Sequence, residues 1–329
     1  MNTVTTSSGR RFEAGSGESL LDAALRQGVV LDHSCRTGRC SSCKSRIRSG
    51  VTVASRDEIG LSAEDKAQGF VLTCVRQARG AVELEIDDLD LVLPEPRTLP
   101  CRIQSLERRS PDVICVLLRL PPSSTLVFLP GQYIEVIGPA GLRRSYSVAN
   151  APRADGQIEL HVREQPGGAM SRYWFQQAKV NDLLRLRGPL GTFFLRGQAG
   201  KDLVLLATGT GIAPAKAILE GLAALPQAAR PRNTTVYWGG RRREDLYWDP
   251  PQVPWLRFVP VLSRADSSWA GSCGHVQDVM LAEHPRLADS LVYACGSDAM
   301  IRDAQSRLCA AGLPQSSFRC DAFVCSAPT

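Results

Sequence analysis

Four cysteines constrain this chain more than any other feature of its sequence. Cys35, Cys40 and Cys43 fall within the stretch CRTGRCSSC, and Cys74 follows in VLTCVRQ, so the spacing is C-x4-C-x2-C-x30-C. This spacing is typical of a plant-type 2Fe-2S cluster, in which four thiolates hold two irons. The fourth ligand can be distant in sequence because folding brings it in. The small residues of the loop let backbone N–H groups approach the sulfur atoms: Gly38, Ser41 and Ser42.

Two other interpretations of these cysteines stay open at this point. A four-cysteine zinc site usually combines two C-x2-C pairs, and this chain has one such step. Four buried cysteines that share no ligand are the other alternative. The spacing favours iron and sulfur. Six further cysteines show no ligand spacing and are interpreted as free thiols: Cys101, Cys115, Cys273, Cys309, Cys320 and Cys325.

Length and charge limit the number of domains, the location and the partners that can be expected. The chain has 329 residues, enough for two or three domains of about 100 to 150 residues each. The N-terminus lacks the apolar core of a secretory signal, and no stretch reaches the roughly 20 apolar residues of a membrane span, so a cytoplasmic location is expected. The net charge of +6 is not gathered into a basic stripe with interleaved aromatics, so no nucleic-acid partner is predicted.

The chain divides into three segments by pattern. Residues 1–92 hold the cysteine loop, the helical stretch ESLLDAALRQG and a capping-box sequence at Ser62 and Asp65. The linker LPEPRTLP then packs three prolines into eight residues. Residues 98–198 contain short strands separated by turn residues, which predicts an antiparallel barrel or sandwich with one helix near MSRYWFQQA. Strands and helices alternate over residues 199–329, which predicts an α/β domain with a parallel sheet.

Two glycine turns and a cysteine–glycine pair are candidate nucleotide sites. QPGGAMS places Gly167 and Gly168 before a predicted helix, whose free N–H groups and dipole attract anions. In DLVLLATGTGIAPAKAIL a strand leads through a Gly-Thr-Gly turn into a helix with Pro214 near its start, which indicates dinucleotide binding. The third glycine of the usual fingerprint is absent. Cys295 and Gly296 follow a later strand, at the sheet edge where α/β proteins bind ligands.

The order of these motifs carries a resemblance. R-x-Y-S, then G-G-x-x-S, then G-T-G-x-x-P, then C-G, all behind a ferredoxin pattern, resembles the ferredoxin–NADP reductase superfamily. The chain is similar over essentially its whole length to members with an N-terminal plant-type ferredoxin domain. The resemblance implies a β-grasp ferredoxin domain (α+β), an antiparallel Greek-key β-barrel that binds FAD, and an α/β parallel-sheet domain that binds the nicotinamide nucleotide.

The same resemblance implies roles for single residues. Ser147 would lie near the flavin N5, Phe323 would cover the flavin and Cys295 would position the nicotinamide, and these are the expected catalytic residues. The expected metal ligands are Cys35, Cys40, Cys43 and Cys74. The remaining expected cofactor contacts are Arg144, Ser145, Tyr146, His161, Arg163, Gly167, Gly168, Ser171, Gly209, Thr210, Gly211, Pro214 and Gly296.

These modules predict an electron path. NADH gives up two electrons as a hydride and a 2Fe-2S cluster accepts one, and a flavin connects them because it takes a hydride and releases electrons singly. NADH is expected as the donor rather than NADPH, although Arg241, Arg242 and Arg243 follow a strand where an arginine can meet a 2′-phosphate.

The protein that accepts the electrons is predicted from two stretches. RRSYSVANAP and FRCDAFV are similar to CDP-6-deoxy-3,4-glucoseen reductases, which supply electrons to a pyridoxamine-phosphate-dependent sugar dehydrase in deoxysugar synthesis. The alternative is a reductase component that serves the terminal oxygenase of an aromatic-ring oxygenase system. A non-enzymatic iron–sulfur binding or sensor protein is the third hypothesis.

Overall fold

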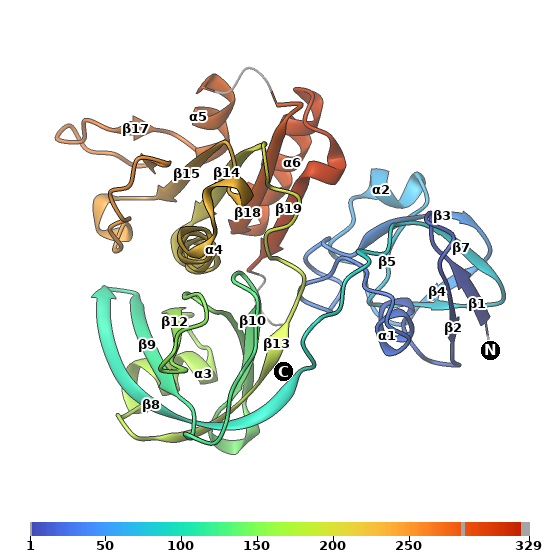
Figure 1. The fold of residues 1–329 in the computed structure, drawn as a ribbon, viewed down its shortest axis with the longest axis horizontal. Helices are drawn as coiled ribbons and strands as arrows, with labels where there is room; N and C mark the ends of the chain where they lie inside the picture. Colours follow the sequence, from blue (N-terminus) through green and yellow to red (C-terminus); the bar gives the residue numbers. More distant parts are fainter. Residues whose placement is uncertain (1, 284–286, 324–329) are drawn as a thin grey trace. The chain divides into compact units, whose positions relative to one another are not determined.

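The computed structural model describes residues 2–283 and 287–323, which form two compact units (Figure 1). The first unit runs to Pro94, and the second runs from Glu95 to Phe323. Cys325, interpreted above as a free thiol, lies outside the described residues. Among those described, no helix is long and apolar enough to cross a membrane.

The first unit is a mixed sheet packed on a short helix. The sheet has the order β2-β1-β7-β3-β5, in which β1 and β7 are parallel and the other neighbours are antiparallel. The helix is capped by Ser19 and buries Leu20, Leu21, Ala23 and Ala24. The strands are β1 (Asn2–Thr5), β2 (Arg11–Ala14), β3 (Lys44–Ser49), β4 (Thr52–Ala54), β5 (Phe70–Leu72), β6 (Arg76–Ala78) and β7 (Val82–Glu85), and the helices are α1 (Leu20–Arg26) and α2 (Ala63–Ala67).

This arrangement is the α+β fold expected for a ferredoxin domain. The predicted capping box at the start of α2 is confirmed, because Ser62 and Asp65 each accept a hydrogen bond from the other's backbone N–H. The small strands β4 and β6 pair with each other outside the main sheet.

The second unit begins with an antiparallel sheet that closes into a barrel. The order is β11-β10-β13-β8-β9-β12, and a bridge between Val148 and Leu160 joins its two edges. The predicted helix near MSRYWFQQA is present as α3 (Ala169–Arg172), which continues into the π-helix η2 (Tyr173–Gln177). The strands are β8 (Arg97–Ser110), β9 (Val113–Arg119), β10 (Tyr133–Ile137), β11 (Arg143–Ser147), β12 (Ile158–Arg163) and β13 (Leu183–Leu190), with the turn η1 (Pro139–Gly141).

Strand β8 begins inside the stretch that the prolines mark as a linker. Pro100 lies within it, opposite Arg185 of β13. Pairing with β9 starts only at Arg102, so this end of β8 has a neighbour on one side alone. Proline is tolerated there because the missing N–H would have faced away from the sheet.

A parallel sheet completes the second unit. Its order is β17-β16-β15-β14-β18-β19, and α4 lies on one side of it while α5 and α6 lie on the other (Figure 1). The strands are β14 (Asp202–Thr208), β15 (Asn233–Gly240), β16 (Leu256–Leu262), β17 (Ser272–Cys273), β18 (Ser290–Gly296) and β19 (Phe318–Ala322). The helices are α4 (Ile212–Ala224), α5 (Val276–Glu283) and α6 (Asp298–Ala310), with short turns η3 (Gly209–Gly211), η4 (Gln227–Ala229), η5 (Arg243–Asp245) and η6 (Gln315–Ser317).

The order in which strands are added to the sheet reverses between β14 and β18, which are parallel to each other. Strands β15 and β16 extend the sheet on one side of β14, whereas β18 and β19 extend it on the other. Open parallel sheets bind ligands at such a switch point, outside the carboxyl ends of the strands. The Gly-Thr-Gly turn and the Cys295-Gly296 pair both lie at these carboxyl ends.

Candidate functional site

The cysteine loop has a backbone shaped to surround a small group. Arg36, Gly38 and Ser41 all have positive φ values, 56°, 77° and 59°. A Cβ atom at Gly38 would lie 2.8 Å from the Asp57 carbonyl oxygen, so only glycine fits there. The turned backbone aims N–H groups at sulfur: Thr37 N lies 3.4 Å from the Cys35 Sγ, and Cys35 N lies 3.4 Å from the Cys40 Sγ.

The structure brings the four predicted ligands together. The Cys35 and Cys40 thiols hydrogen-bond each other, and so do those of Cys43 and Cys74. Cys43 and Cys74 belong to one hydrophobic cluster, and Thr73 N donates to the Cys43 carbonyl oxygen. Four converging thiols with backbone N–H donors suit a 2Fe-2S cluster, which supplies one-electron transfer when bound.

Several basic side chains around the loop are already paired. Arg36 forms an ion pair with Asp22, and the Lys44 Nζ lies 3.1 Å from the Asp65 Oδ1. The Arg48 guanidinium lies 3.8 Å from the Glu85 carboxylate. These partners offset much of the positive charge that the sequence places beside the cluster.

Strand β11 presents the residues expected to contact the flavin. Ser147 is buried, and its Oγ lies 3.1 Å from the Oδ2 of Asp321, a buried carboxylate on β19. Tyr146 points to the other face, where its hydroxyl accepts a hydrogen bond from the Trp174 indole at 2.9 Å. Burial raises the pKa of Tyr146, so its hydroxyl stays protonated. Arg144 and Ser145 complete the strand and are partly or fully exposed.

The predicted glycine pair lies at the start of α3. Gly167 has a φ of 77°, and Gly168 is the N-cap residue of the helix. No side chain caps the helix, so its first N–H groups have no side-chain acceptor. The Ser171 Oγ accepts a hydrogen bond from Gln165 N at 2.6 Å, which ties the turn to the helix. This geometry suits a phosphate group.

The Gly-Thr-Gly turn and the cysteine–glycine pair touch each other. A Cβ atom at Gly211 would lie 2.3 Å from the Cys295 carbonyl oxygen, and one at Gly296 would lie 2.3 Å from the Thr208 Oγ1. Only glycine permits this approach of the ends of β14 and β18. The Cys295 thiol donates to the Gly211 carbonyl oxygen at 2.8 Å and is 1% exposed. Burial raises the pKa of Cys295, so the thiol is protonated and is not a nucleophile.

A cleft of about 760 Å³ opens at the carboxyl ends of the parallel strands. Gly209, Thr210 and Gly296 line it, and so does Phe323, whose backbone N–H donates to the Gly296 carbonyl oxygen at 2.8 Å. Arg163 of the barrel also lines the cleft. The predicted Pro214 is buried in α4, three residues after Gly211. Of the residues expected at the nicotinamide nucleotide, the cleft is therefore lined by Gly209, Thr210 and Gly296, whereas Gly211, Pro214 and Cys295 do not line it.

Two acidic residues of the cleft, Asp112 and Asp245, were not predicted from the sequence. The Arg241 guanidinium lies 3.0 Å from each carboxylate oxygen of Asp245 and 3.4 Å from Asp112. Asp112 also accepts from Arg163 at 2.9 Å, so the four charged groups form a chain along the cleft. The sequence prediction at the stretch RRRED rested on its arginines alone. Its acidic residue was the missing signal, whereas Asp112 comes from the barrel and has no local signal.

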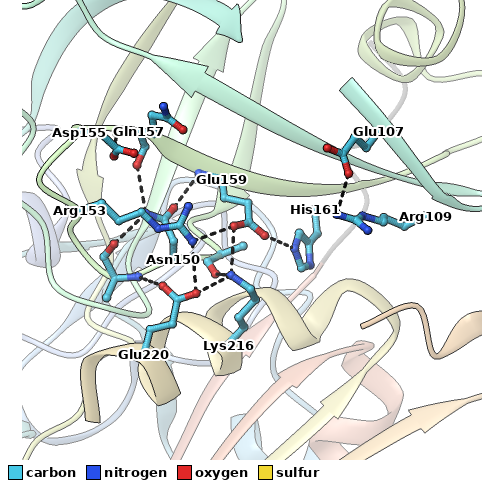
Figure 2. Close-up of polar contacts among 12 residues, drawn as sticks. Glu107, Arg109, Asn150, Arg153, Asp155, Gln157, Glu159, His161, Lys216 and Glu220 are labelled. Carbon is cyan, nitrogen blue, oxygen red and sulfur yellow. Dashed lines mark hydrogen bonds and ion pairs between the residues drawn. The ribbon is translucent and has the colours of Figure 1, made fainter. Parts of the chain in front are cut away.

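His161 has its partners within the protein. Its Nε2 lies 3.0 Å from the Glu159 Oε1, and its Nδ1 lies 3.0 Å from the Tyr247 hydroxyl. The ring is 1% exposed and does not line the cleft. Burial lowers the pKa of His161, so it is neutral, donating from Nε2 to the carboxylate and accepting from the tyrosine at Nδ1. The structure places His161 between the barrel and the parallel-sheet part, as Figure 2 shows.

Three family models match the chain in succession. Residues 4–79 match a 2Fe-2S iron–sulfur cluster binding domain, residues 100–195 an oxidoreductase FAD-binding domain, and residues 205–306 an oxidoreductase NAD-binding domain. These matches agree with the loop, the barrel and the cleft. They bear out the predicted combination of cluster, FAD and nicotinamide nucleotide.

Curated proteins of similar length resemble the whole chain. The CDP-6-deoxy-L-threo-D-glycero-4-hexulose-3-dehydrase reductase of Yersinia pestis is 39% identical over 330 residues, covering 98% of both chains. Reductase component 2 of the terephthalate 1,2-dioxygenase of a Comamonas species is 32% identical, covering 95% of this chain and 94% of its own. Among solved structures, the Amycolatopsis reductase GcoB superposes with a TM-score of 0.74 at 31% identity, covering 98% of this chain and 99% of its own.

Proposed function

The chain belongs to the iron–sulfur flavoprotein reductases of the ferredoxin–NADP reductase superfamily, and on this premise we propose that it supplies electrons from NADH to a sugar dehydrase. Members of this family pass electrons from a nicotinamide nucleotide through FAD to a 2Fe-2S cluster. The observation that carries the choice of dehydrase is the 39% identity over the full length to a hexulose-dehydrase reductase. The acceptor proposed is a pyridoxamine-phosphate-dependent enzyme of deoxysugar synthesis.

In this proposal the residues form three groups, which hold the flavin, orient the nicotinamide nucleotide and hold the iron–sulfur cluster. Bound FAD would accept a hydride and release its electrons one at a time. The strand that carries Tyr146 and Ser147 would hold the flavin, and the Gly168 turn would hold its diphosphate. The turn from Gly209 to Gly211 would orient the nicotinamide nucleotide, and Phe323 would exclude water from the flavin face. The four cysteines of the first unit would hold the cluster.

We further propose NADH rather than NADPH as the donor. The turn after β15, the second strand of the nucleotide fold, is where such folds recognise the adenosine ribose. Here the Arg241 guanidinium is engaged by Asp245 and Asp112. A 2′-phosphate at this place would have to compete with two carboxylates for one arginine and would be repelled by both.

A second acceptor class is supported by a specific observation. Reductase components of terephthalate 1,2-dioxygenase are 31% and 32% identical over 95% or more of this chain. The alternative is therefore that the chain serves a terminal oxygenase. Both functions use the same nicotinamide nucleotide, flavin and cluster, so only the protein that accepts the electrons distinguishes them.

The test is reconstitution with each acceptor. The holoprotein, with FAD and cluster loaded, is mixed anaerobically with NADH, and bleaching of the flavin and cluster absorbance is followed. It is then supplied with a pyridoxamine-phosphate-dependent sugar dehydrase and its hexulose substrate, or with a terephthalate-type oxygenase and its aromatic substrate. We expect NADH-dependent turnover with the dehydrase.

Ferricyanide is the control because it accepts electrons from the flavin without a protein partner. Flavin bleaching with dehydrase turnover supports the proposal. Bleaching with turnover only in the oxygenase mixture establishes the second candidate instead. Absence of bleaching would contradict both and leave an iron–sulfur protein without reductase activity.

A further inference from the structure

Lys216 lies in the second unit, away from the cleft. It is on α4, five residues after Gly211, and its side chain is 10% exposed. A buried ammonium group needs acceptors for its three N–H donors. Its Nζ has all three, at 3.0 Å from the Ala149 carbonyl oxygen, 3.1 Å from the Glu159 Oε2 and 2.7 Å from the Glu220 Oε1 (Figure 2).

These contacts join the barrel to the parallel-sheet part of the unit. Two of the three acceptors, the strand-end carbonyl and Glu159 of β12, belong to the barrel, whereas Glu220 is on α4. Glu220 also reaches the barrel, because its carboxylate accepts from Ala151 N at 3.0 Å and from Arg153 at 3.3 Å. Arg153 in turn lies 3.1 Å from Glu159. Two cations and two carboxylates thus form a closed network.

The barrel side of this network is held firmly. Asn150 is fully buried, and its side chain accepts from Glu159 N at 2.7 Å and donates to the Gln157 carbonyl oxygen at 3.1 Å. Ala149 N donates to the Glu159 carbonyl oxygen at 2.8 Å. The segment after β11 is therefore fixed to β12. The carbonyl that Lys216 contacts lies only two residues after Ser147.

The carboxylate facing Lys216 is ionised. Burial raises the pKa of Glu159, but the hydrogen bond to His161 and the charge of Lys216 outweigh it and lower that pKa to about 2. The ammonium therefore faces a full negative charge across the junction. A charge-assisted contact of this kind restricts the relative position of the two groups more than a neutral one does.

We propose that Lys216 is a positioning residue for hydride transfer. By tying α4 to the segment after β11, it sets the distance between the Gly209–Gly211 turn and Ser147, so that a nicotinamide on the turn faces a flavin on the strand. The inference deepens the proposed function and rests on it. Lys216 itself does not line the cleft, so we expect it to act through the two segments that it joins. The rate of hydride transfer depends steeply on this distance, because displacing the reacting groups by about 1 Å can lower the rate about 100-fold.

Metal binding is the alternative interpretation of the polar residues between the barrel and α4. Ligand atoms of Cys115, Glu159 and His161 lie within 4.8 Å of one another. Lys216 and His161 already occupy the two carboxylate oxygens of Glu159, and Tyr247 occupies the second nitrogen of His161. The ammonium supplies the positive charge that a metal would bring, so the positioning role accounts for the cluster without an ion.

The test compares Lys216→Met with Lys179→Met in the holoprotein. Methionine keeps the length of the stem and removes the charge, and Lys179 is an exposed lysine of the same unit. Stopped-flow reduction of the flavin by NADH gives the limiting rate and the apparent Kd, and NADH deuterated at C4 gives the isotope effect. Reoxidation of dithionite-reduced protein by ferricyanide reports the step that needs no nicotinamide.

We expect Lys216→Met to lower the limiting rate about 10- to 100-fold with an enlarged isotope effect. The apparent Kd, FAD content and ferricyanide rate should stay within about threefold of the unsubstituted protein, as should every value for Lys179→Met. A Lys216→Met protein with an unchanged limiting rate would overturn the inference. If the unsubstituted protein is not reduced by NADH, the proposed function fails and the inference with it.

A double variant separates positioning from loss of a buried charge. Lys216→Met with Glu220→Gln removes one cation and one carboxylate together, and Glu159 keeps Arg153 and His161 as partners. It also provides a folded protein if the single variant does not fold. A double variant that is as stable as the unsubstituted protein but still slow supports positioning. One that regains the full rate shows that unpaired charge, not position, caused the loss.

Discussion

Single side chains decide whether the iron–sulfur centre can form. Cys74 is the proposed ligand most distant in sequence from the other three, and its thiol lies against that of Cys43. With Cys74→Ser the site loses one of four thiolates, so we expect the iron content and the cluster absorbance to fall. Transfer from NADH to cytochrome c should then drop at least about tenfold, because one-electron exit has lost its carrier.

Reduction of ferricyanide by NADH should persist in this variant, since it needs only the flavin. Cys273→Ser is the matched control, because Cys273 is an exposed thiol outside the cluster loop. Equal loss of iron in both variants, or an intact cluster in Cys74→Ser, would show that Cys74 is not a ligand. Iron analysis and electron paramagnetic resonance of the reduced proteins give the readout.

The thiol of Cys295 supports the nucleotide turn from inside. It donates to the Gly211 carbonyl oxygen, and alanine would remove that donor and leave a small gap beneath the turn. We expect Cys295→Ala to slow flavin reduction by NADH about tenfold through a shift of the turn. Cys101→Ala, which removes an equally buried thiol from the barrel, should not change this rate. An unchanged rate in Cys295→Ala means that the residue does not position the nicotinamide.

The turn after β15 is a compact element that we expect to set donor preference. Asp245 accepts both from the Arg241 side chain and from its backbone N–H, so the turn and the guanidinium are fixed together. Asp245→Ala should release Arg241 for a 2′-phosphate. A new charged hydrogen bond is worth about 1.5 kcal/mol or more, so kcat/KM for NADPH relative to NADH should rise about tenfold.

Glu244→Ala is the control for this prediction, because Glu244 is the exposed acidic neighbour in the same turn. The two substitutions change net charge equally, and only one of them frees the arginine. If both raise the NADPH ratio alike, bulk charge rather than this turn sets the preference. Initial rates with the two donors at equal ionic strength give the measurement.

Elements with a local signal were predictable from the sequence, and those without one were not. The buried run DLVLLAT predicted β14, and Ser62 with Asp65 predicted the start of α2. Strand β8 was not predicted, because the prolines at its start are typical of a linker and only the pairing with β13 shows a strand there. The four cysteines and the glycine turns could be selected as candidate sites from the sequence, because their spacing is typical of cluster and nucleotide binding.

The rest of the site depends on contacts between distant elements. Asp112 contacts Arg241 in the cleft, and Asp321 contacts Ser147. The sequence around these two acidic residues predicts neither contact. The sequence around Lys216 gives no sign that this lysine is buried, because its burial comes from the packing of α4 on the barrel. Such residues need the three-dimensional pairing of elements, which a single sequence does not supply.

In the second unit, the barrel and the parallel sheet are joined by buried polar contacts. Ser147 with Asp321 is one such contact, and the network around Lys216 and Glu159 is another. Breaking these contacts leaves buried polar groups unpaired, at a cost of about 1 to 3 kcal/mol each. We therefore expect the barrel and the sheet to unfold together and to release FAD in the same transition.

The pH dependence of that transition should depend on His161. Its ring faces Glu159 and Tyr247, with the charges of Lys216 and Arg109 nearby, and burial lowers its pKa below the ordinary value. Below about pH 6.5 the unfolded chain therefore binds a proton at His161, whereas the folded unit does not. The contribution of His161 to the free energy of unfolding is complete above that pH and decreases below it. At pH 5.5 the loss from this one group amounts to at most about 1.4 kcal/mol.

His161→Gln should flatten this dependence, because glutamine does not titrate. The guanidinium midpoint for release of fluorescent FAD, measured at pH 7.5 and 5.5, gives the slope for each protein. The variant is expected to be less stable at pH 7.5, since it loses a well-placed hydrogen-bond pair, yet to lose less on acidification. His275→Gln, at an exposed histidine of the same unit, should keep the full slope. Because a change in slope separates titration from packing, equal slopes in all three proteins would place the acid sensitivity of the unit elsewhere.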